Sequence, residues 1–240
     1  MASAQQKNRK PLILQGRISN SPEKFLKISL FDENNSVQFD TLHLNDKGEF
    51  YLKTFKITRP QRTNLWQNRT YIGQIYVAPG YELQITADAT SFFTSLTSKK
   101  ITGIGEESNR YRVQWDTTKA AAADKRPWYE RKPEEVVPYL KFQRRLDDSI
   151  YHKVFARSQP KDPYFNFFKK IIEIDNQSQS FAILLQFSMV NNYNKAEMED
   201  LIHNNIPPLF ANKISNDDYL ISQEYTEWIV PLYYEYKKAG

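Results

Sequence analysis

The 240-residue chain contains no cysteine. This absence excludes disulfide bonds, thiolate metal sites and cysteine nucleophiles within the chain. Glycine is also scarce, with 7 residues, and low-complexity stretches are missing. We therefore expect an ordered globular chain, long enough to bury a sizeable core.

Long hydrophobic runs are missing too. The longest, residues 181–190, is interrupted by polar side chains and is about half of the roughly 20 residues that a membrane-spanning helix needs. Residues 1–7 are polar and lack the apolar stretch of a signal peptide. The sequence thus predicts no transmembrane segment.

No block of like charges occurs, although the chain is mildly basic. Its 33 Lys and Arg residues are interspersed with 28 Asp and Glu residues, giving a net charge of +5. Residues 125–132 mix cations with Trp128 and Tyr129, a combination that nucleic-acid-binding proteins use. One short, acid-flanked segment is weak support for that function, so we interpret it as a solvated connector and expect no nucleic-acid partner.

The first hundred residues show the pattern of β-strands. Apolar and polar residues alternate in several short runs, and turn residues separate them without intervening helices. Residues 57–68 look polar and irregular, and residues 92–101 suggest one more short strand. Pro79 and Gly80 fit the two central positions of a type II turn, where the second residue needs a positive φ. This pattern predicts an antiparallel β-sandwich over residues 1–105.

The remainder of the chain is typical of helices. Gly103 and Gly105 form a short loop that leads into a helix near residue 109, and Pro133 is placed to begin a long helix. Separate helices are expected from Asp162-Pro163 and over residues 178–193, followed by one over 195–205 and a last one over 217–238 that Pro231 interrupts. The sequence therefore predicts a segregated α+β fold, with an all-α domain over residues 106–240.

Constellations that carry catalysis or bind metals are missing. His43, His152 and His203 stand far apart, and neither a metal-binding His-Glu-x-x-His motif nor a nucleophile elbow is present. Gly103-Ile104-Gly105 lacks the third glycine and the βαβ unit of a dinucleotide site. We therefore predict no catalytic, cofactor-binding or metal-binding residues. A hydrolase that uses scattered Asp and His residues is the least favoured class.

Four aromatic residues gather near the end of the chain: Trp228, Tyr233, Tyr234 and Tyr236. At helical spacing such residues usually pack against other helices. The alternative, which we keep open, is that they form an interface with a partner.

Four stretches together resemble a known family: residues 14–18, 44–50, 76–83 and 101–111. They are similar to the opening strand, the Asp-x-Gly-x-Phe hairpin, the Pro-Gly turn and the Gly-x-Gly entry to the helices in the N-terminal region of TlpA-type thioredoxin-like proteins of Bacteroidetes. Tyr81 departs from that pattern, because the family often carries Asp there. The catalytic Cys-x-x-Cys pair of the family has no counterpart in this chain.

The resemblance implies an exported protein of the periplasm or cell envelope. In that family a β-sandwich and a helical segment precede the thioredoxin domain. We therefore expect a non-enzymatic accessory module that positions or dimerises the catalytic domain or binds its clients. The expected partner is the thioredoxin domain itself or another protein, and homodimerisation is a further option. The alternative is a free-standing envelope protein that binds a protein or a glycan.

Overall fold

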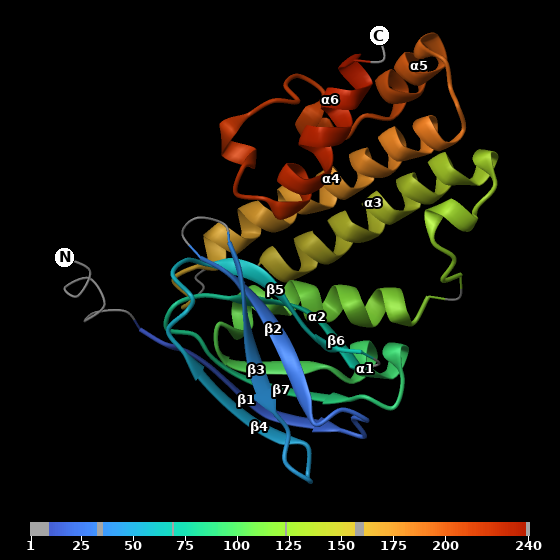
Figure 1. The fold of residues 1–240 in the computed structure, drawn as a ribbon. Coiled ribbons are helices and arrows are strands. Elements are labelled where there is room, and N and C mark those ends of the chain that lie inside the picture. Colours follow the sequence, from blue (N-terminus) through green and yellow to red (C-terminus); the bar gives the residue numbers. More distant parts are fainter. Residues whose placement is uncertain (1–9, 33–35, 69, 123, 157–160, 239–240) are drawn as a thin grey trace. The chain divides into compact units, whose positions relative to one another are not determined.

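The computed structural model describes residues 10–32, 36–68, 70–122, 124–156 and 161–238 (Figure 1). The polar start at residues 1–7 lies outside this part. Two four-stranded sheets come first and helices follow, which confirms the predicted α+β class. The strands are β1 (Leu12–Ser19), β2 (Phe25–Phe31), β3 (Val37–His43), β4 (Glu49–Thr54), β5 (Gln61–Gln67), β6 (Thr70–Val77), β7 (Glu82–Asp88) and β8 (Lys100–Ile104). The helices are α1 (Phe92–Ser98), α2 (Glu106–Ala120), α3 (Pro133–Phe155), α4 (Phe165–Val190), α5 (Lys195–Asn205) and α6 (Val230–Lys238).

The two sheets have the strand orders β4-β1-β7-β8 and β3-β2-β5-β6. The pairings are antiparallel except that of β1 with β7, which is parallel. Alternate side chains of β1, β2, β5 and β7 point inward, in keeping with the period of two of a strand. Leu12, Leu14, Leu26, Ile28, Leu30, Leu83 and Ile85 are all buried and form much of the sandwich core.

The prediction for residues 57–68 was wrong, because β5 occupies Gln61–Gln67. Its inward positions include the polar residues Gln61 and Thr63, and both are buried. The Gln61 side chain accepts a hydrogen bond from Phe31 N–H at 2.7 Å and donates one to Phe31 O at 3.0 Å. The Gln61 side chain thus bonds to β2 in place of a main-chain pairing. Because Gln61 and Thr63 are polar although they point inward, the hydrophobicity pattern did not indicate this strand.

Residues 92–98 form helix α1 and not the suggested strand. Ser91 caps the helix by accepting the Thr94 N–H at 3.1 Å. The two helices predicted over residues 163–193 are a single helix, α4. Its polar middle looks like a break in sequence, yet Asp175 is buried there and accepts a hydrogen bond from Ser222 Oγ at 2.5 Å.

The C-terminal helices were predicted more closely. Pro133 begins α3, and Pro138 lies inside that helix. A π-helical turn at Tyr225–Ile229 precedes α6, so the interruption comes just before Pro231. The buried core of this part includes Val136, Leu140, Ile174, Phe181, Leu184, Leu185, Phe210, Tyr225 and Ile229.

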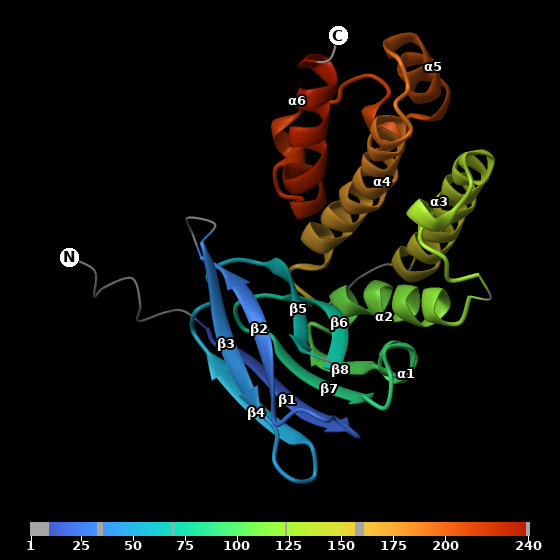
Figure 2. The same cartoon turned by 45° about the vertical axis from the view of Figure 1, so that its right-hand side comes forward.

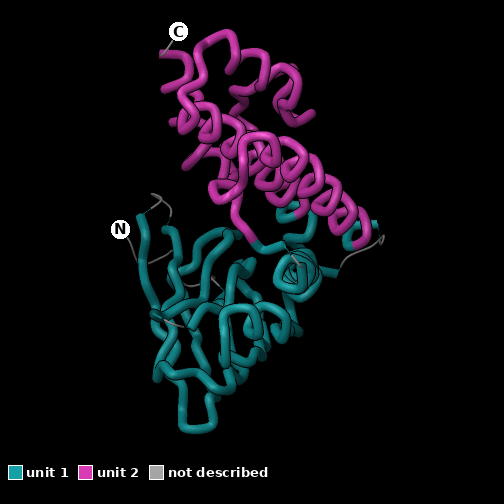
Figure 3. Tube along the Cα trace, turned by 90° about the vertical axis from the view of Figure 1, so that its right-hand side faces the viewer, with its two compact units in different colours: residues 1–125, 154–168 teal, residues 126–153, 169–240 magenta. Residues whose placement is uncertain are grey.

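The described chain divides into two compact units, coloured separately in Figure 3. Unit 1 comprises residues 1–125 and 154–168, and unit 2 comprises 126–153 and 169–240. The predicted boundary after residue 105 follows the change from strand to helix. The units divide differently because α2 packs against β6, β8 and α1 within unit 1.

Candidate functional site

Helix α2 lies along β6 and β8, the edge strands of the two sheets, with α1 beside it (Figure 2). An edge strand presents main-chain groups that its own sheet leaves unpaired. Side chains satisfy them here. Ser95 Oγ donates to Tyr71 O at 2.6 Å, and Lys99 Nζ donates to Gln74 O at 3.2 Å. Together with Asn109, which bonds to Tyr76, these side chains bond to the main chain of β6 at three positions.

The Asn109 side chain bonds to β6 as the main chain of a neighbouring strand would. Its Oδ1 accepts the Tyr76 N–H at 2.8 Å, and its Nδ2 donates to Tyr76 O at 2.8 Å. The same Nδ2 donates to Gly105 O at 3.0 Å. Asn109 is fully buried, so these bonds compensate for removing its amide from water.

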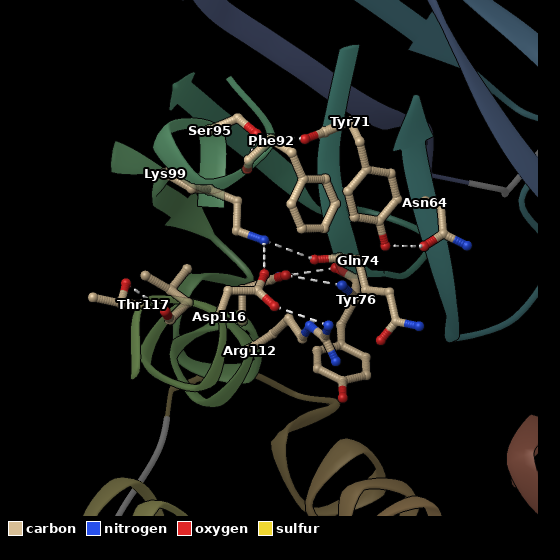
Figure 4. Close-up of polar contacts among 12 residues, drawn as sticks. Asn64, Tyr71, Gln74, Tyr76, Phe92, Ser95, Lys99, Arg112, Asp116 and Thr117 are labelled. Atoms are coloured by element: carbon tan, nitrogen blue, oxygen red, sulfur yellow. Dashed lines mark hydrogen bonds and ion pairs between the residues drawn. The ribbon is translucent and has the colours of Figure 1, made fainter. Parts of the chain in front are cut away.

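A buried charge cluster lies next to these contacts (Figure 4). Lys99 Nζ forms an ion pair with Asp116 Oδ2, and an Arg112 guanidinium nitrogen lies 2.8 Å from Asp116 Oδ1. Lys99 is only 2% exposed and Asp116 is fully buried. Burial lowers the pKa of Lys99 to about 8, although the Asp116 carboxylate opposes that shift.

A lysine with a lowered pKa is a candidate nucleophile or general base. Lys99 has no space beside it for a reacting group, however. A Cβ atom added at Gly73 would lie 2.9 Å from Lys99 Nζ and 3.1 Å from Asp116 Oδ2. A hollow of about 320 Å³ lies elsewhere, lined by residues including Arg17, Asn20 and Asp46. The geometry around Lys99 is therefore that of a structural ion pair.

A second buried cluster joins the Pro-Gly turn to the start of α2. Tyr81 Oη lies 2.7 and 2.8 Å from the two carboxylate oxygens of Asp162 and donates to that group. Ser108 Oγ also donates to Asp162 Oδ2, at 2.6 Å. Burial raises the pKa of Tyr81 well above its usual value, and the negative charge of Asp162 raises it further.

Asp162 also caps α2 from a distant part of the chain. The residue preceding the helix is Gly105, whose φ is 105° and which has no side chain to offer. Asp162 Oδ2 accepts the Ser108 N–H at 3.3 Å, and Glu107 Oε2 accepts the Asp162 N–H at 2.9 Å. A carboxylate at a helix N-terminus satisfies free N–H groups and interacts favourably with the helix dipole.

Of the predicted turn residues, Gly105 contacts this cluster, and the others lie in the adjoining turn and strand. Gly80 has a φ of 86°, and the Tyr81 N–H donates to Ala78 O at 3.1 Å across the turn. Gly103 lies within β8 opposite Leu83, and Gly105 contacts the Tyr81 ring closely enough that an added Cβ would lie 2.4 Å from Tyr81 Cδ2. Pro79 occupies the first corner of the turn.

The predicted aromatic cluster divides into two pairs. Tyr233 and Tyr236 pack against the core of unit 2, with ring centroids 5.7 Å apart. Trp228 and Tyr234 are exposed. In the basic segment 125–132, Lys125 lies over the Phe93 ring while Trp128 packs against the core of unit 2.

His43, His152 and His203 belong to β3, α3 and α5. Among the residues that the structure describes, no three His, Asp or Glu side chains are grouped so as to hold a metal ion. Within the same part, no helix is long and apolar enough to cross a membrane.

The Lys99–Asp116 pair was not predicted, because an isolated lysine and an isolated aspartate 17 positions apart form no recognisable pattern. For Asp162, the sequence predicted only that a helix begins at Asp162-Pro163. It does accept the Tyr164 N–H at 2.9 Å, but its contacts with Tyr81 and Ser108 are the larger part of its role.

Comparison of the chain with models of protein families, with curated protein sequences and with solved structures finds no match.

Proposed function

We propose that this chain is a non-catalytic accessory module of an exported, TlpA-type thioredoxin-like thiol–disulfide oxidoreductase. In this proposal it positions or dimerises the catalytic domain or binds its clients. The observation that carries the proposal is the contact between Gly105 and Tyr81, which joins two of the four stretches on which the family resemblance rests.

A third of these stretches occupies an equally constrained place. A Cβ atom added at Gly16 in β1 would lie 1.8 Å from Ile85 O in β7, so another residue there would force the two strands apart. Three of the four stretches that carry the resemblance thus lie at close contacts within unit 1. This supports a shared architecture as the origin of the resemblance.

The use of the buried polar side chains supports a module that is not an enzyme. Lys99 and Asn109 bond to the main chain of β6, and Asp162 bonds to the start of α2. These contacts give each side chain a structural role. Catalytic groups, in contrast, need room for a substrate beside them.

A free-standing envelope protein that binds a protein or a glycan is the alternative. The coding sequence that follows codon 240 distinguishes the two functions. We expect it to continue in frame into a thioredoxin domain with a Cys-x-x-Cys pair, whereas a stop codon would favour the alternative.

The continued protein should then reduce insulin in the presence of dithiothreitol, while residues 1–240 alone run at the blank rate, because they have no thiolate to attack a disulfide. Acceleration that scales with the concentration of the 240-residue chain would contradict a non-catalytic module. Export is tested separately by fractionating cells that express the gene from its own start codon.

A further inference from the structure

Four aromatic side chains lie on three neighbouring elements of unit 1. We call Trp66, Tyr71, Phe92 and Phe93 the aromatic strip. Trp66 in β5 lies directly opposite Tyr71 in β6. Tyr71 stacks on Phe92 of α1 with centroids 5.5 Å apart, as Figure 4 shows, and Phe92 meets Phe93 edge to face at 5.2 Å.

Three of the strip's four side chains are exposed to solvent, and Tyr71 between them is half-buried. Trp66 is 37% exposed, Phe92 49% and Phe93 43%. Single exposed apolar residues are ordinary, but contiguous apolar patches on a soluble protein usually mark a binding surface. The rings come from three different elements that are packed together within unit 1, so the strip is a fixed feature of that unit.

Both ends of the strip carry a lysine. Lys27 Nζ lies 5.8 Å from the centre of the Trp66 ring, and Lys125 Nζ lies 4.1 Å from that of Phe93. In the part of the chain that the structure describes, neither lysine forms an ion pair with an acid. The strip therefore presents apolar surface between two cations, which complements a ligand with apolar and negatively charged groups.

The orientation of the rings decides which ligand fits best. Nucleic-acid bases and sugars bind aromatic side chains by stacking on open ring faces. Tyr71 and Phe92 stack with an angle of 16° between their rings and so cover one face of each other, and the lysines lie over Trp66 and Phe93. Apolar side chains of a protein can pack against ring edges, and aromatic residues are enriched in protein interfaces.

We propose that the aromatic strip binds an unfolded or extended polypeptide segment that combines apolar with acidic side chains. This proposal rests on the client-binding role proposed above and gives that role a surface. The rings contact apolar side chains of the segment, while Lys27 and Lys125 contact its carboxylates.

The test uses α-lactalbumin with reduced, carboxamidomethylated cysteines as an unfolded acidic probe. Lysozyme treated in the same way serves as an unfolded basic probe. Binding to the 240-residue chain is measured by fluorescence anisotropy for three variants: Trp66→Ser with Phe93→Ser, Lys27→Glu with Lys125→Glu, and Tyr51→Ser. Tyr51 is the matched control, because it is 60% exposed but lies on β4 of the other sheet. Circular dichroism and the urea midpoint establish that each variant is folded.

We expect the acidic probe to bind more tightly than the basic one. The ring variant and the charge-reversal variant should each weaken binding at least about tenfold, as loss of central interface contacts does, while Tyr51→Ser changes it little. The proposal would be overturned if the acidic probe did not bind, or if it bound equally strongly to all three variants. Binding of oligothymidylate or dextran sulfate through the same rings, without binding of the unfolded protein, would also overturn it. The reading-frame test is independent, so a Cys-x-x-Cys pair beyond codon 240 would leave the proposed function standing if the strip fails.

Discussion

The Tyr81 hydroxyl donates a hydrogen bond to the Asp162 carboxylate at 2.7 Å, although 81 positions separate the two residues. Both are buried, and Ser108 at the start of α2 joins them through the same carboxylate. One aspartate thus connects the Pro-Gly turn, the first turn of α2 and the segment that leads into α4.

Replacing Asp162 by alanine should destabilise the protein by about 2–3 kcal/mol, because buried donors on Tyr81 and Ser108 would lose a charged acceptor. Urea unfolding followed by tryptophan fluorescence gives the free energy of unfolding. Asp46→Ala is the matched control, since Asp46 lies in a loop with its side chain fully exposed and should change stability by less than about 0.5 kcal/mol. Equal effects of the two substitutions would contradict the role of Asp162.

Gly105→Ala should destabilise the protein more than Gly80→Ala. Both glycines have positive φ, which costs another residue about 1–2 kcal/mol. At Gly80 the nearest atom to an added Cβ is Lys10 Cδ of a flexible side chain, at 3.0 Å. At Gly105 the obstacle is the buried Tyr81 ring at 2.4 Å, which has no free space to enter. Urea unfolding measures both losses of stability. A larger loss from Gly80→Ala than from Gly105→Ala would contradict the predicted order.

The pattern of residues predicted the fold class because alternating strands and periodic helices depend on local hydrophobicity. It failed at β5 and in the middle of α4, where Gln61 and Asp175 are polar residues in buried positions. Their hydrogen-bond partners, Phe31 and Ser222, lie 30 and 47 positions away, so no local pattern reveals them. The buried clusters around Lys99 and Asp162 escaped prediction for the same reason, since each is assembled from separate elements.

The Lys99–Asp116 ion pair should show strong coupling in a double-mutant cycle. Lys99→Met alone should cost about 3 kcal/mol, because it leaves the buried Asp116 Oδ2 and Gln74 O without their shared donor. The double variant Lys99→Met with Asp116→Leu should lose much less than the sum of the single losses, because the carboxylate that Lys99 pairs with is removed together with the lysine. Additive losses would indicate that the two side chains do not interact. Lys100→Met, at the neighbouring exposed position, is the control.

Stability should rise as pH increases from about 8 toward 10. The pKa of Lys99 is about 8 in the folded protein and 10.5 in a free lysine, so in this range the unfolded chain binds more protons. Stability increases with pH wherever that holds. Above about pH 10 the raised pKa of Tyr81 reverses the trend, since the unfolded tyrosine then loses its proton first. The urea midpoint of Lys99→Met, measured over the same pH range, should lack the rise. A rise of the same size in this variant would assign the effect to another group.

Helix α2 is an integral part of the β-sandwich unit, to which Asn109, Lys99 and Asp162 attach it. Native-state hydrogen exchange tests it most directly, with the buried Tyr76 N–H, which donates to Asn109, as the reporter. We expect the amides of α2 and of Tyr76 to exchange as slowly as those of β1 and β7, which open only with the whole unit. Asn109→Ala should accelerate exchange at Tyr76 and α2 while the amides of β1 stay protected. Exchange of α2 much faster than the strands in the unmodified protein would contradict the claim.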